Sequence, residues 1–441
     1  MEDRKNVLAN FEKYAGYTED TVKTGIEKNR KAYAEITVKN KEGNPVSNVT
    51  VNVEQKEHAF KYGANIFMLD ELETAEKNEA YKKYFADAFN MATLPFYWDD
   101  LEPEKGKQRY SAGSPKIYRR PPIDLCLDFC RKNNIEPREH ALAYDHFFPD
   151  WLADKSVTEV KFELERRFSE IAERYADKIH TIEVTNEMMW DVGKTKFYRA
   201  DDYLEWCYKT AEKYFPNNQL VINEWSGLWY NTWEKLSPYY MMIENTILKG
   251  GRIDAIGMQY HMFQKREDEK NNVQKSYNPV NLYSILDTYA GLNRPIQITE
   301  VTVPAYSNDS ADEEIQAQII ENLYSIWFSH ANVEQIIYWN LVDGYAAFAP
   351  QGDMTSGENY YYGGLLRFDM TPKPSYYTIK NLFQKKWHTS ETITTGSDGS
   401  AVFKGFKGKY EVTVLADGKK ISKTADFSSS DAMHNKLEIE I

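Results

Sequence analysis

Between Phe60 and Leu341, short runs of apolar and β-branched residues alternate with amphipathic helical stretches. This alternation is the pattern of repeated βα units around a parallel sheet. Eight such units predict an α/β fold, a (β/α)8 TIM barrel, with its active site at the carboxyl ends of the strands. The predicted strands are residues 60–67, 88–94, 136–143, 179–184, 220–223, 255–259, 296–299 and 335–339.

Ahead of the barrel, apolar and polar residues alternate one by one. Residues 33–38 and 49–54 show this period of two, and the segment Lys41-Glu42-Gly43-Asn44-Pro45 between them is rich in turn-forming residues. The pattern predicts a β-hairpin outside the barrel.

The C-terminal end of the chain has the same character as the N-terminal end. Residues 401–403, 410–415 and 437–441 alternate apolar and polar positions, and Asp417-Gly418 is a predicted turn. Neither end has enough strands to build a core alone. We therefore expect both ends to combine into one accessory β-sandwich beside the barrel.

These patterns divide the chain into three predicted parts. Residues 1–58 form an N-terminal extension and the hairpin that joins the sandwich, residues 59–388 form the catalytic barrel, and residues 389–441 supply the C-terminal strands of the sandwich.

Composition narrows the classes of partner. A formal charge of −13 and a pI near 5.3 disfavour general binding to nucleic acid or to an anionic membrane surface. The N-terminus lacks the apolar segment of a signal peptide, and no run of about 18 apolar residues occurs. Localisation stays open, because a trimmed signal would leave no trace.

The cysteines and histidines predict neither a disulfide framework nor a metal site. Cys126, Cys130 and Cys207 are an odd and sparse set, which is typical of free thiols. The eight histidines lack the short-spaced pairs of a zinc enzyme, and no glycine-rich phosphate loop precedes a helix. We expect no cofactor, no metal, and a monomer.

Two glutamates stand where predicted strands end. Asn186-Glu187 follows the strand at 179–184, and Glu300 follows the strand at 296–299. Hydrolysis of a glycosidic bond needs one carboxyl group to protonate the leaving oxygen and another to attack the sugar carbon. The chain has 67 acidic residues, so the presence of two glutamates alone predicts nothing. The prediction rests on their positions at the ends of predicted strands.

At these positions the chain resembles glycoside hydrolase family 10, over roughly residues 60–385. Asn186-Glu187 resembles the acid/base signature of that family, and Ile298-Thr299-Glu300 resembles its nucleophile signature. The segment 257–261 resembles the family's Gly-x-Gln-x-His, whose histidine contacts the nucleophile. Known members are mostly endo-β-1,4-xylanases with a retaining mechanism, so the resemblance implies a retaining, endo-β-1,4-xylanase-like enzyme that uses a double displacement with two glutamates, with xylan the first substrate to test.

A further segment strengthens the resemblance. Residues 140–144 followed by Pro149-Asp150-Trp151 resemble the family's His-Thr-Leu-Val-Trp-His…Pro-x-Trp, with Asp145 in place of the second histidine. The predicted catalytic residues are Glu187 as acid/base and Glu300 as nucleophile. The predicted substrate-binding residues are His140, Asn186, Gln259, His261, Trp339, Asn223, Tyr144, Asp145 and Trp98.

Elementary chemistry adds expectations for some of these groups. Carboxylates about 5 to 5.5 Å apart resist double ionisation, so we expect a raised pKa for Glu187 as the acid. His261 is expected to donate to Glu300 and keep it ionised. Asn186 is expected to bind a sugar 2-hydroxyl, and Trp339 to form an apolar floor below the reacting sugar. Glu224 is expected to order the hydrogen bonds around Glu187.

The chain also departs from the family pattern. The second-strand Glu-Asn pair that grips the neighbouring sugar gives way to Pro95-Phe96, and the aspartate usual shortly after the nucleophile is missing from Glu300-Val301-Thr302. Family members usually carry a tryptophan after the eighth strand, and the corresponding position in this chain falls near Ala347 and Phe348. A changed polar lining alters specificity more than the reaction, which favours a β-glycanase acting on decorated xylan or another β-linked chain.

Two other functions stay open from the sequence. One is a carbohydrate-binding barrel without turnover, which the presence of both glutamates disfavours. The other gives the β-rich ends an adhesive role, although Phe403, Phe406 and Tyr410 alternate too loosely for an aromatic binding face and fit a core better. The predicted partner in every case is a β-linked polysaccharide or oligosaccharide.

Overall fold

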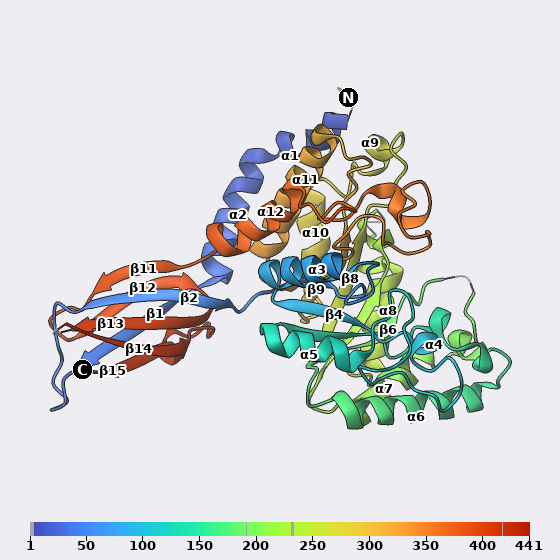
Figure 1. The fold of residues 1–441 in the computed structure, drawn as a ribbon, viewed down its shortest axis with the longest axis horizontal. Helices are drawn as coiled ribbons and strands as arrows, with labels where there is room; N and C mark the ends of the chain where they lie inside the picture. The colour runs from blue at the N-terminus through green and yellow to red at the C-terminus, as the bar shows by residue number, and fades with distance from the viewer. Residues whose placement is uncertain (1–3, 191, 231–232, 417) are drawn as a thin grey trace.

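The computed structural model describes residues 4–190, 192–230, 233–416 and 418–441, and the predicted turn residue Asp417 lies outside them. Within these residues the chain forms a barrel with a β-sandwich at its side (Figure 1). The predicted fold class, a (β/α)8 barrel with an accessory sandwich built from both chain ends, is confirmed.

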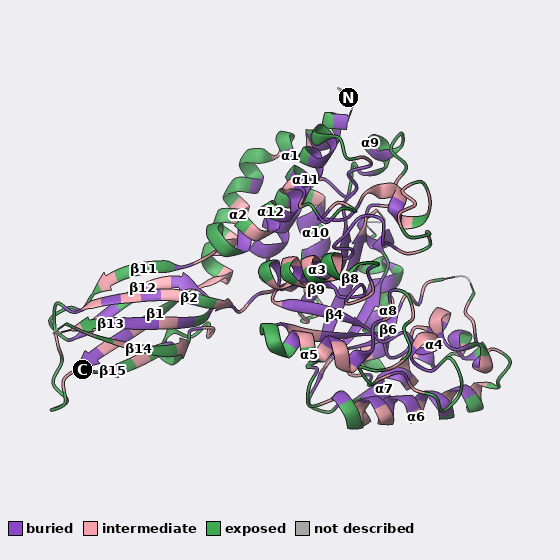
Figure 2. Cartoon of the chain, viewed as in Figure 1, coloured by how far each residue is buried: buried purple, intermediate pink, exposed green. Residues whose placement is uncertain are grey.

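Eight parallel strands close the barrel in the order β10-β3-β4-β5-β6-β7-β8-β9. All eight predicted strands are present. Strands of a parallel barrel are covered on both faces, so they are rich in apolar residues and almost wholly buried (Figure 2). The strands are β3 (Lys61–Asn65), β4 (Met91–Pro95), β5 (Glu136–His140), β6 (Thr181–Asn186), β7 (Gln219–Glu224), β8 (Ala255–His261), β9 (Ile296–Thr302) and β10 (Val333–Tyr338).

Helices surround the strands and expose their polar sides (Figure 2). In α6, Ser156 and Glu159 form a capping box at the first turn, and Val160, Leu164 and Phe168 turn one apolar stripe toward the strands. In the described part of the chain no helix has the length and apolarity needed to cross a membrane. The helices are α3 (Ala75–Ala88), α4 (Trp98–Leu101), α5 (Ile123–Asn133), α6 (Val157–Tyr175), α7 (Tyr203–Tyr214), α8 (Pro238–Leu248), α9 (Glu269–Asn272), α10 (Pro279–Ala290), α11 (Ser310–Ser329) and α12 (Pro374–Asn381).

The sandwich interleaves strands from the two chain ends. One sheet has the order β12-β1-β15 and the other has the order β11-β2-β13-β14, so each N-terminal strand lies between two C-terminal ones. The alternating apolar residues of both sheets, such as Ile36, Val51 and Val412, meet in one core. The strands are β1 (Lys31–Lys39), β2 (Thr50–His58), β11 (Ser390–Thr394), β12 (Ser400–Phe406), β13 (Gly408–Ala416), β14 (Lys419–Asp426) and β15 (Lys436–Glu440).

The predicted hairpin between residues 33–38 and 49–54 is wrong. Strands β1 and β2 belong to opposite sheets, and the segment between them crosses from one sheet to the other. Each strand has one apolar face, and placing the two strands in opposite sheets lets those faces pack against each other.

Residues 4–29 lie on the barrel, not in the sandwich. Helices α1 (Ala9–Lys13) and α2 (Ala15–Asn29) run beside α11 and α12 (Figure 1). The contact is close at Gly25, where a Cβ atom would lie 2.5 Å from the Ser329 carbonyl oxygen. Only part of the predicted unit 1–58 therefore joins the sandwich; its boundaries at 58 and 388 stay predictions.

Arg30 joins helix α2, the sandwich and the barrel at one buried point. Its guanidinium donates to the carbonyl oxygens of Phe328 and His330 at the end of α11 and, at 2.6 Å, to that of Val333 at the start of β10. Burial lowers the pKa of Arg30 to about 10. The Phe328 ring stacks on Trp387 with centroids 4.1 Å apart and lies 5.3 Å from the Arg30 guanidinium, so aromatic rings pack against this cation.

Replacing Arg30 with methionine should lower the free energy of unfolding by roughly 2 to 4 kcal/mol, because carbonyl groups at the end of α11 lose their donor. Chemical denaturation followed by tryptophan fluorescence measures this loss. The control is Lys28→Met, which changes an exposed cation on the same helix. Equal stability of the two variants would contradict the assigned role of the joint.

Candidate active site

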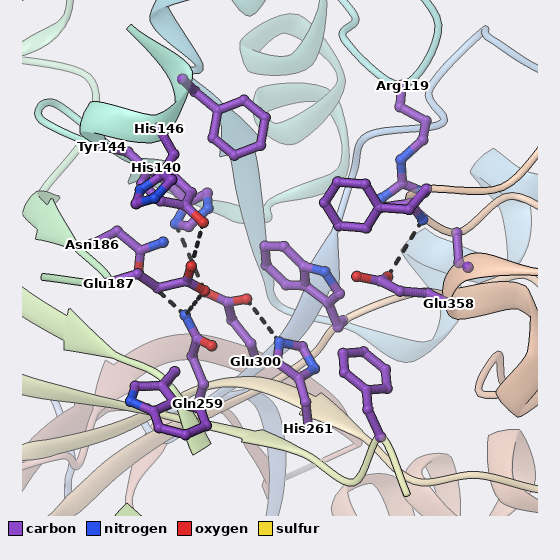
Figure 3. A pocket seen from close by; sticks show the side chains of 18 of the residues that line it. Arg119, His140, Tyr144, His146, Asn186, Glu187, Gln259, His261, Glu300 and Glu358 are labelled. Atoms are coloured by element: carbon purple, nitrogen blue, oxygen red, sulfur yellow. Dashed lines mark hydrogen bonds and ion pairs between the residues drawn. The ribbon is translucent and has the colours of Figure 1, made fainter. Parts of the chain in front are cut away.

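A cavity of about 1020 Å³ opens at the carboxyl ends of the barrel strands. Side chains from β5, β6, β8, β9 and the segments that follow them converge on it (Figure 3). Most predicted site residues line this cavity, namely His140, Tyr144, Asn186, Glu187, Gln259, His261, Glu300 and Trp339.

Glu187 follows β6 in a left-handed backbone conformation, with φ of 52°. This conformation is disfavoured for a residue with a side chain, so the surrounding contacts must hold it. The carboxylate accepts hydrogen bonds from the Tyr144 hydroxyl, from Trp190 Nε1 at 2.8 Å and from Gln259 Nε2 at 2.9 Å. Three donors from three segments fix the direction of this carboxylate.

Glu300 lies in β9 and is buried. Its Oε1 accepts from Asn223 Nδ2 at 3.0 Å, and its Oε2 lies 3.0 Å from His261 Nε2. Burial, with the negative charges of Glu183 and Glu187, raises the pKa of Glu300 to about 8. The expectation placed the raised pKa on Glu187 and an ionised carboxylate on Glu300. The raised pKa of Glu300, whose carboxyl group is buried in the barrel, runs against the ionised carboxylate expected there.

Asn223, at the end of β7, connects the groups around both glutamates. Its Nδ2 donates to Asn186 Oδ1 at 2.9 Å as well as to Glu300, and its Oδ1 accepts from Thr299 at 2.6 Å. Gln259 Nε2 completes the chain, because it lies 3.2 Å from Asn186 Oδ1 and also donates to Glu187. Amide groups thus run continuously from one glutamate to the other.

Below this network lies a fully buried layer of charge. Glu183 accepts from Arg138 Nη2 at 2.5 Å, and His140 Nδ1 lies 2.8 Å from its other oxygen. His140, Glu183 and Glu300 present ligand-type atoms within 4.8 Å of one another. The ion pair with Arg138 already neutralises Glu183, so the cluster acts as an internal salt-bridge network under Glu300.

The chain matches the model of glycosyl hydrolase family 10 over residues 54–382. The chain belongs to this family. Curated relatives include the anti-sigma-I factor RsgI6 of Acetivibrio thermocellus, which is 24% identical over 411 residues, covering 91% of this chain and 47% of the relative. Endo-1,4-beta-xylanase B of Thermotoga neapolitana is 26% identical over 343 residues, covering 74% of this chain and 88% of the relative.

Solved structures share the barrel. Native xylanase 10B from Thermotoga maritima superposes with a TM-score of 0.59 at 23% identity, over 74% of this chain and 96% of that protein. The chain spans less than half the length of the first curated relatives it matches.

Thr302 takes the place of the aspartate that is usual after the nucleophile in family 10. Its hydroxyl lies 2.9 Å from His261 Nδ1, on the side of the ring opposite Glu300. Burial lowers the pKa of His261. A neutral ring has one donor and one acceptor nitrogen, so an Oγ–H···Nδ1 bond from Thr302 leaves Nε2–H to donate to Glu300.

Three predicted substrate-binding residues do not line the cavity. Trp98 opens α4 and is buried against α6, with Nε1 donating to Glu102 at 2.9 Å; the preceding residue, Tyr97, faces the cavity. Asp145 is buried and accepts from Thr195 Oγ1 at 2.5 Å, which anchors the segment after Glu187. Asn223 lies under the glutamates and positions them.

Glu224, which was expected to order the hydrogen bonds around Glu187, bonds the backbone beside Glu187 and not its carboxyl group. It is buried at the end of β7, and burial raises its pKa to about 8. Its two oxygens accept from the backbone N–H of Met188 at 2.8 Å and of Trp225 at 2.9 Å. The first of these bonds holds the residue directly after Glu187.

Several cavity residues lie on loops and were missed from the sequence. His146 lines the cavity one residue beyond the position where the family pattern placed a histidine, so an alignment that allowed one insertion would have found it. Arg119 and Arg120 lie on the irregular segment between α4 and α5, Glu358 lies in a short 3-10 helix (Gly357–Tyr361) after β10, and no sequence signal marks them. Figure 3 shows Arg119 and Glu358 on the side of Glu300 opposite Glu187.

Replacing Glu300 with glutamine should stabilise the protein more at high pH than at low pH. The folded state holds the Glu300 proton up to pH about 8, whereas the unfolded chain releases it near the ordinary value of 4.5. The contribution of the Glu300 carboxyl group to the free energy of unfolding is therefore lost as the pH rises between these two values. Glutamine is neutral throughout, so the gap in melting temperature over the wild type should widen from pH 5 to pH 9.

The control for this measurement is Glu314→Gln, which replaces an exposed carboxylate on α11. The difference in melting temperature between Glu314→Gln and the wild type should not show this widening. The absence of widening for Glu300→Gln as well would contradict the raised pKa.

Proposed function

We propose that this chain is a retaining endo-β-glycosidase, with β-1,4-linked xylan as its first substrate to test. The observation that carries the proposal is the hydrogen-bonded chain that joins Glu187 to Glu300 through Gln259, Asn186 and Asn223. It holds two carboxyl groups from different strands toward one point of an open cavity. Membership of family 10 agrees with this chemistry.

In the first step an oxygen of Glu300 attacks the anomeric carbon while the bond to the leaving oxygen breaks. Glu187 gives its proton to that oxygen, and a glycosyl-enzyme ester forms on Glu300. The attack needs Glu300 ionised, and because its pKa is raised to about 8, the reactive form grows as the pH rises toward that value. Asn223 and His261 each donate to one oxygen of Glu300 and so orient it.

In the second step Glu187, now ionised, takes a proton from water, and the water oxygen attacks the same carbon. The ester bond breaks and Glu300 is released. Two inversions return the sugar to its original anomeric configuration. The donors Tyr144, Trp190 and Gln259 hold the Glu187 carboxylate in place for both proton transfers.

The cavity fits the interior of a sugar chain. Its lining continues on both sides of the glutamates, to Trp190 beside Glu187 and to Arg119 and Glu358 beyond Glu300 (Figure 3), and it includes the aromatic side chains of Trp225, Tyr118 and Phe348. All four aromatic side chains are at least 40% exposed, which suits stacking against the apolar faces of sugar rings. Binding on both sides of the cleaved bond supports endo action on a β-linked polysaccharide.

The two glutamates should respond differently to replacement by glutamine. On xylan, Glu187→Gln should reduce kcat by about 10² to 10⁴-fold, because proton transfer to the leaving oxygen is lost. On an aryl β-xylobioside with an acidic phenol, which leaves without help, the glycosyl-enzyme should still form in a burst. Glu300→Gln should remove hydrolysis of both substrates.

Release of reducing sugar and of the phenol measures these effects, with Glu314→Gln as the matched control. Unchanged turnover in Glu300→Gln would refute its role as nucleophile. A wild-type protein that binds xylan without cleaving it would favour a carbohydrate-binding barrel instead.

A further inference from the structure

The geometry of the glutamates gives the cavity a direction. A general acid stands beside the leaving group that it protonates, so the Glu187 side receives the leaving part of the chain. The opposite side, beyond Glu300, receives the sugars that stay attached to the enzyme in the intermediate. Arg119 and Glu358 lie on that side (Figure 3).

Strand β4 offers few polar groups to that side. Its end, Pro95-Phe96, is buried and apolar, and Tyr97 contributes a hydroxyl that lies 3.1 Å from His140 Nε2. Polar recognition of a second sugar on this side must therefore come from other segments.

Arg119 is a buried cation held mainly by neutral groups. Its side chain lines the cavity, and both terminal nitrogens donate to Asn340 Oδ1 at 3.3 Å, with a further bond to the Tyr345 carbonyl. No carboxylate of the described residues lies within 4.0 Å of its guanidinium. Its backbone is left-handed, with φ of 63°, although it has a bulky side chain. A guanidinium has five donors, so some remain for a ligand.

Glu358 faces Arg119 across Asn340. Its Oε2 accepts from Asn340 Nδ2 at 3.2 Å and from the backbone N–H of Ala347 at 3.4 Å. No bond to Oε1 is formed by the described residues, and the side chain lines the cavity. One amide thus fixes a carboxylate and a guanidinium at a set spacing.

Arg120 lines the same side of the cavity as Arg119 and Glu358, and the three form one wall of it. Its Nε bonds Asp100 Oδ2 at 2.7 Å, and its guanidinium lies over the Tyr97 ring, 3.8 Å from the centroid. The formal charges of Arg119, Arg120, Asp100 and Glu358 cancel. A wall without net charge favours a neutral pyranose over a uronic acid, while its paired donors and acceptors suit sugar hydroxyl groups.

We propose that Glu358, Arg119 and Arg120 bind the hydroxyl groups of a neutral pyranose next to the reacting sugar, on the side opposite the leaving group. These loop residues supply the polar contacts that the end of β4 lacks, and so determine specificity. The proposal rests on the proposed direction of the reaction. It concerns recognition of the second sugar and leaves the bond-breaking steps unchanged.

The test compares two substrates, a 4-nitrophenyl β-xyloside with one sugar and a 4-nitrophenyl β-xylobioside with two. Glu358→Asp keeps the charge that acts on His261 but withdraws the carboxylate from the second sugar. It should lower kcat/KM for the two-sugar substrate by about 10 to 100-fold, the range for a hydrogen bond to a charged group. Activity on the one-sugar substrate should be unchanged.

Arg119→Lys is the second variant, because lysine keeps the charge and loses the planar fork of donors. It should show the same selective loss. Glu314→Gln, far from the cavity, should change neither substrate. An equal fall on both substrates would show a merely structural role and overturn the inference, as would no fall on either.

A failure of the proposed reaction is distinguishable from a failure of this inference. If the wild type cleaves neither glycoside, calorimetric binding of xylobiose decides the inference alone. Weaker binding to Glu358→Asp than to the wild type supports it, and equal binding overturns it.

Discussion

The site depends on one buried ion pair, between Arg138 and Glu183 in the barrel interior. Both side chains are fully buried, and an unpaired charge there would be strongly destabilising. Glu183 in turn holds the His140 ring and accepts from Asn223 at 3.2 Å. Through Asn223 the same network reaches Glu300, so the orientation of the Glu300 carboxyl group is set from beneath by charges that never meet solvent.

The network also explains why the two glutamates differ. Glu300 lies among buried polar groups, and its raised pKa reflects the cost of a further negative charge beside Glu183. Glu187 stands closer to the opening, and its three donors come from segments that line the cavity. One carboxyl group is positioned by the barrel and the other by its loops.

The sequence predicted the parts of the molecule that follow a period. The eight strands were found by alternation, and Glu187 and Glu300 were found because they stand where strands end. The hairpin was mispredicted because a period of two does not say in which sheet a strand pairs. Trp98 was predicted because it matches a tryptophan of the family pattern, but at the start of α4 the preceding residue, Tyr97, is the one that lines the cavity. Arg119 lies on an irregular segment and Glu358 in a short 3-10 helix, and only tertiary contacts bring them together.

The role of Glu300 as nucleophile is tested most directly by trapping the glycosyl-enzyme. A 2-deoxy-2-fluoro β-xylobioside with an activated leaving group forms the intermediate but slows its hydrolysis, and mass spectrometry of a peptic digest locates the bound sugar. If Glu300 is the nucleophile, the bound sugar lies on the peptide that contains Glu300, and the Glu300→Gln variant carries no bound sugar. A bound sugar on Glu187 or another residue, or an inverted anomeric product on xylan, would contradict this role.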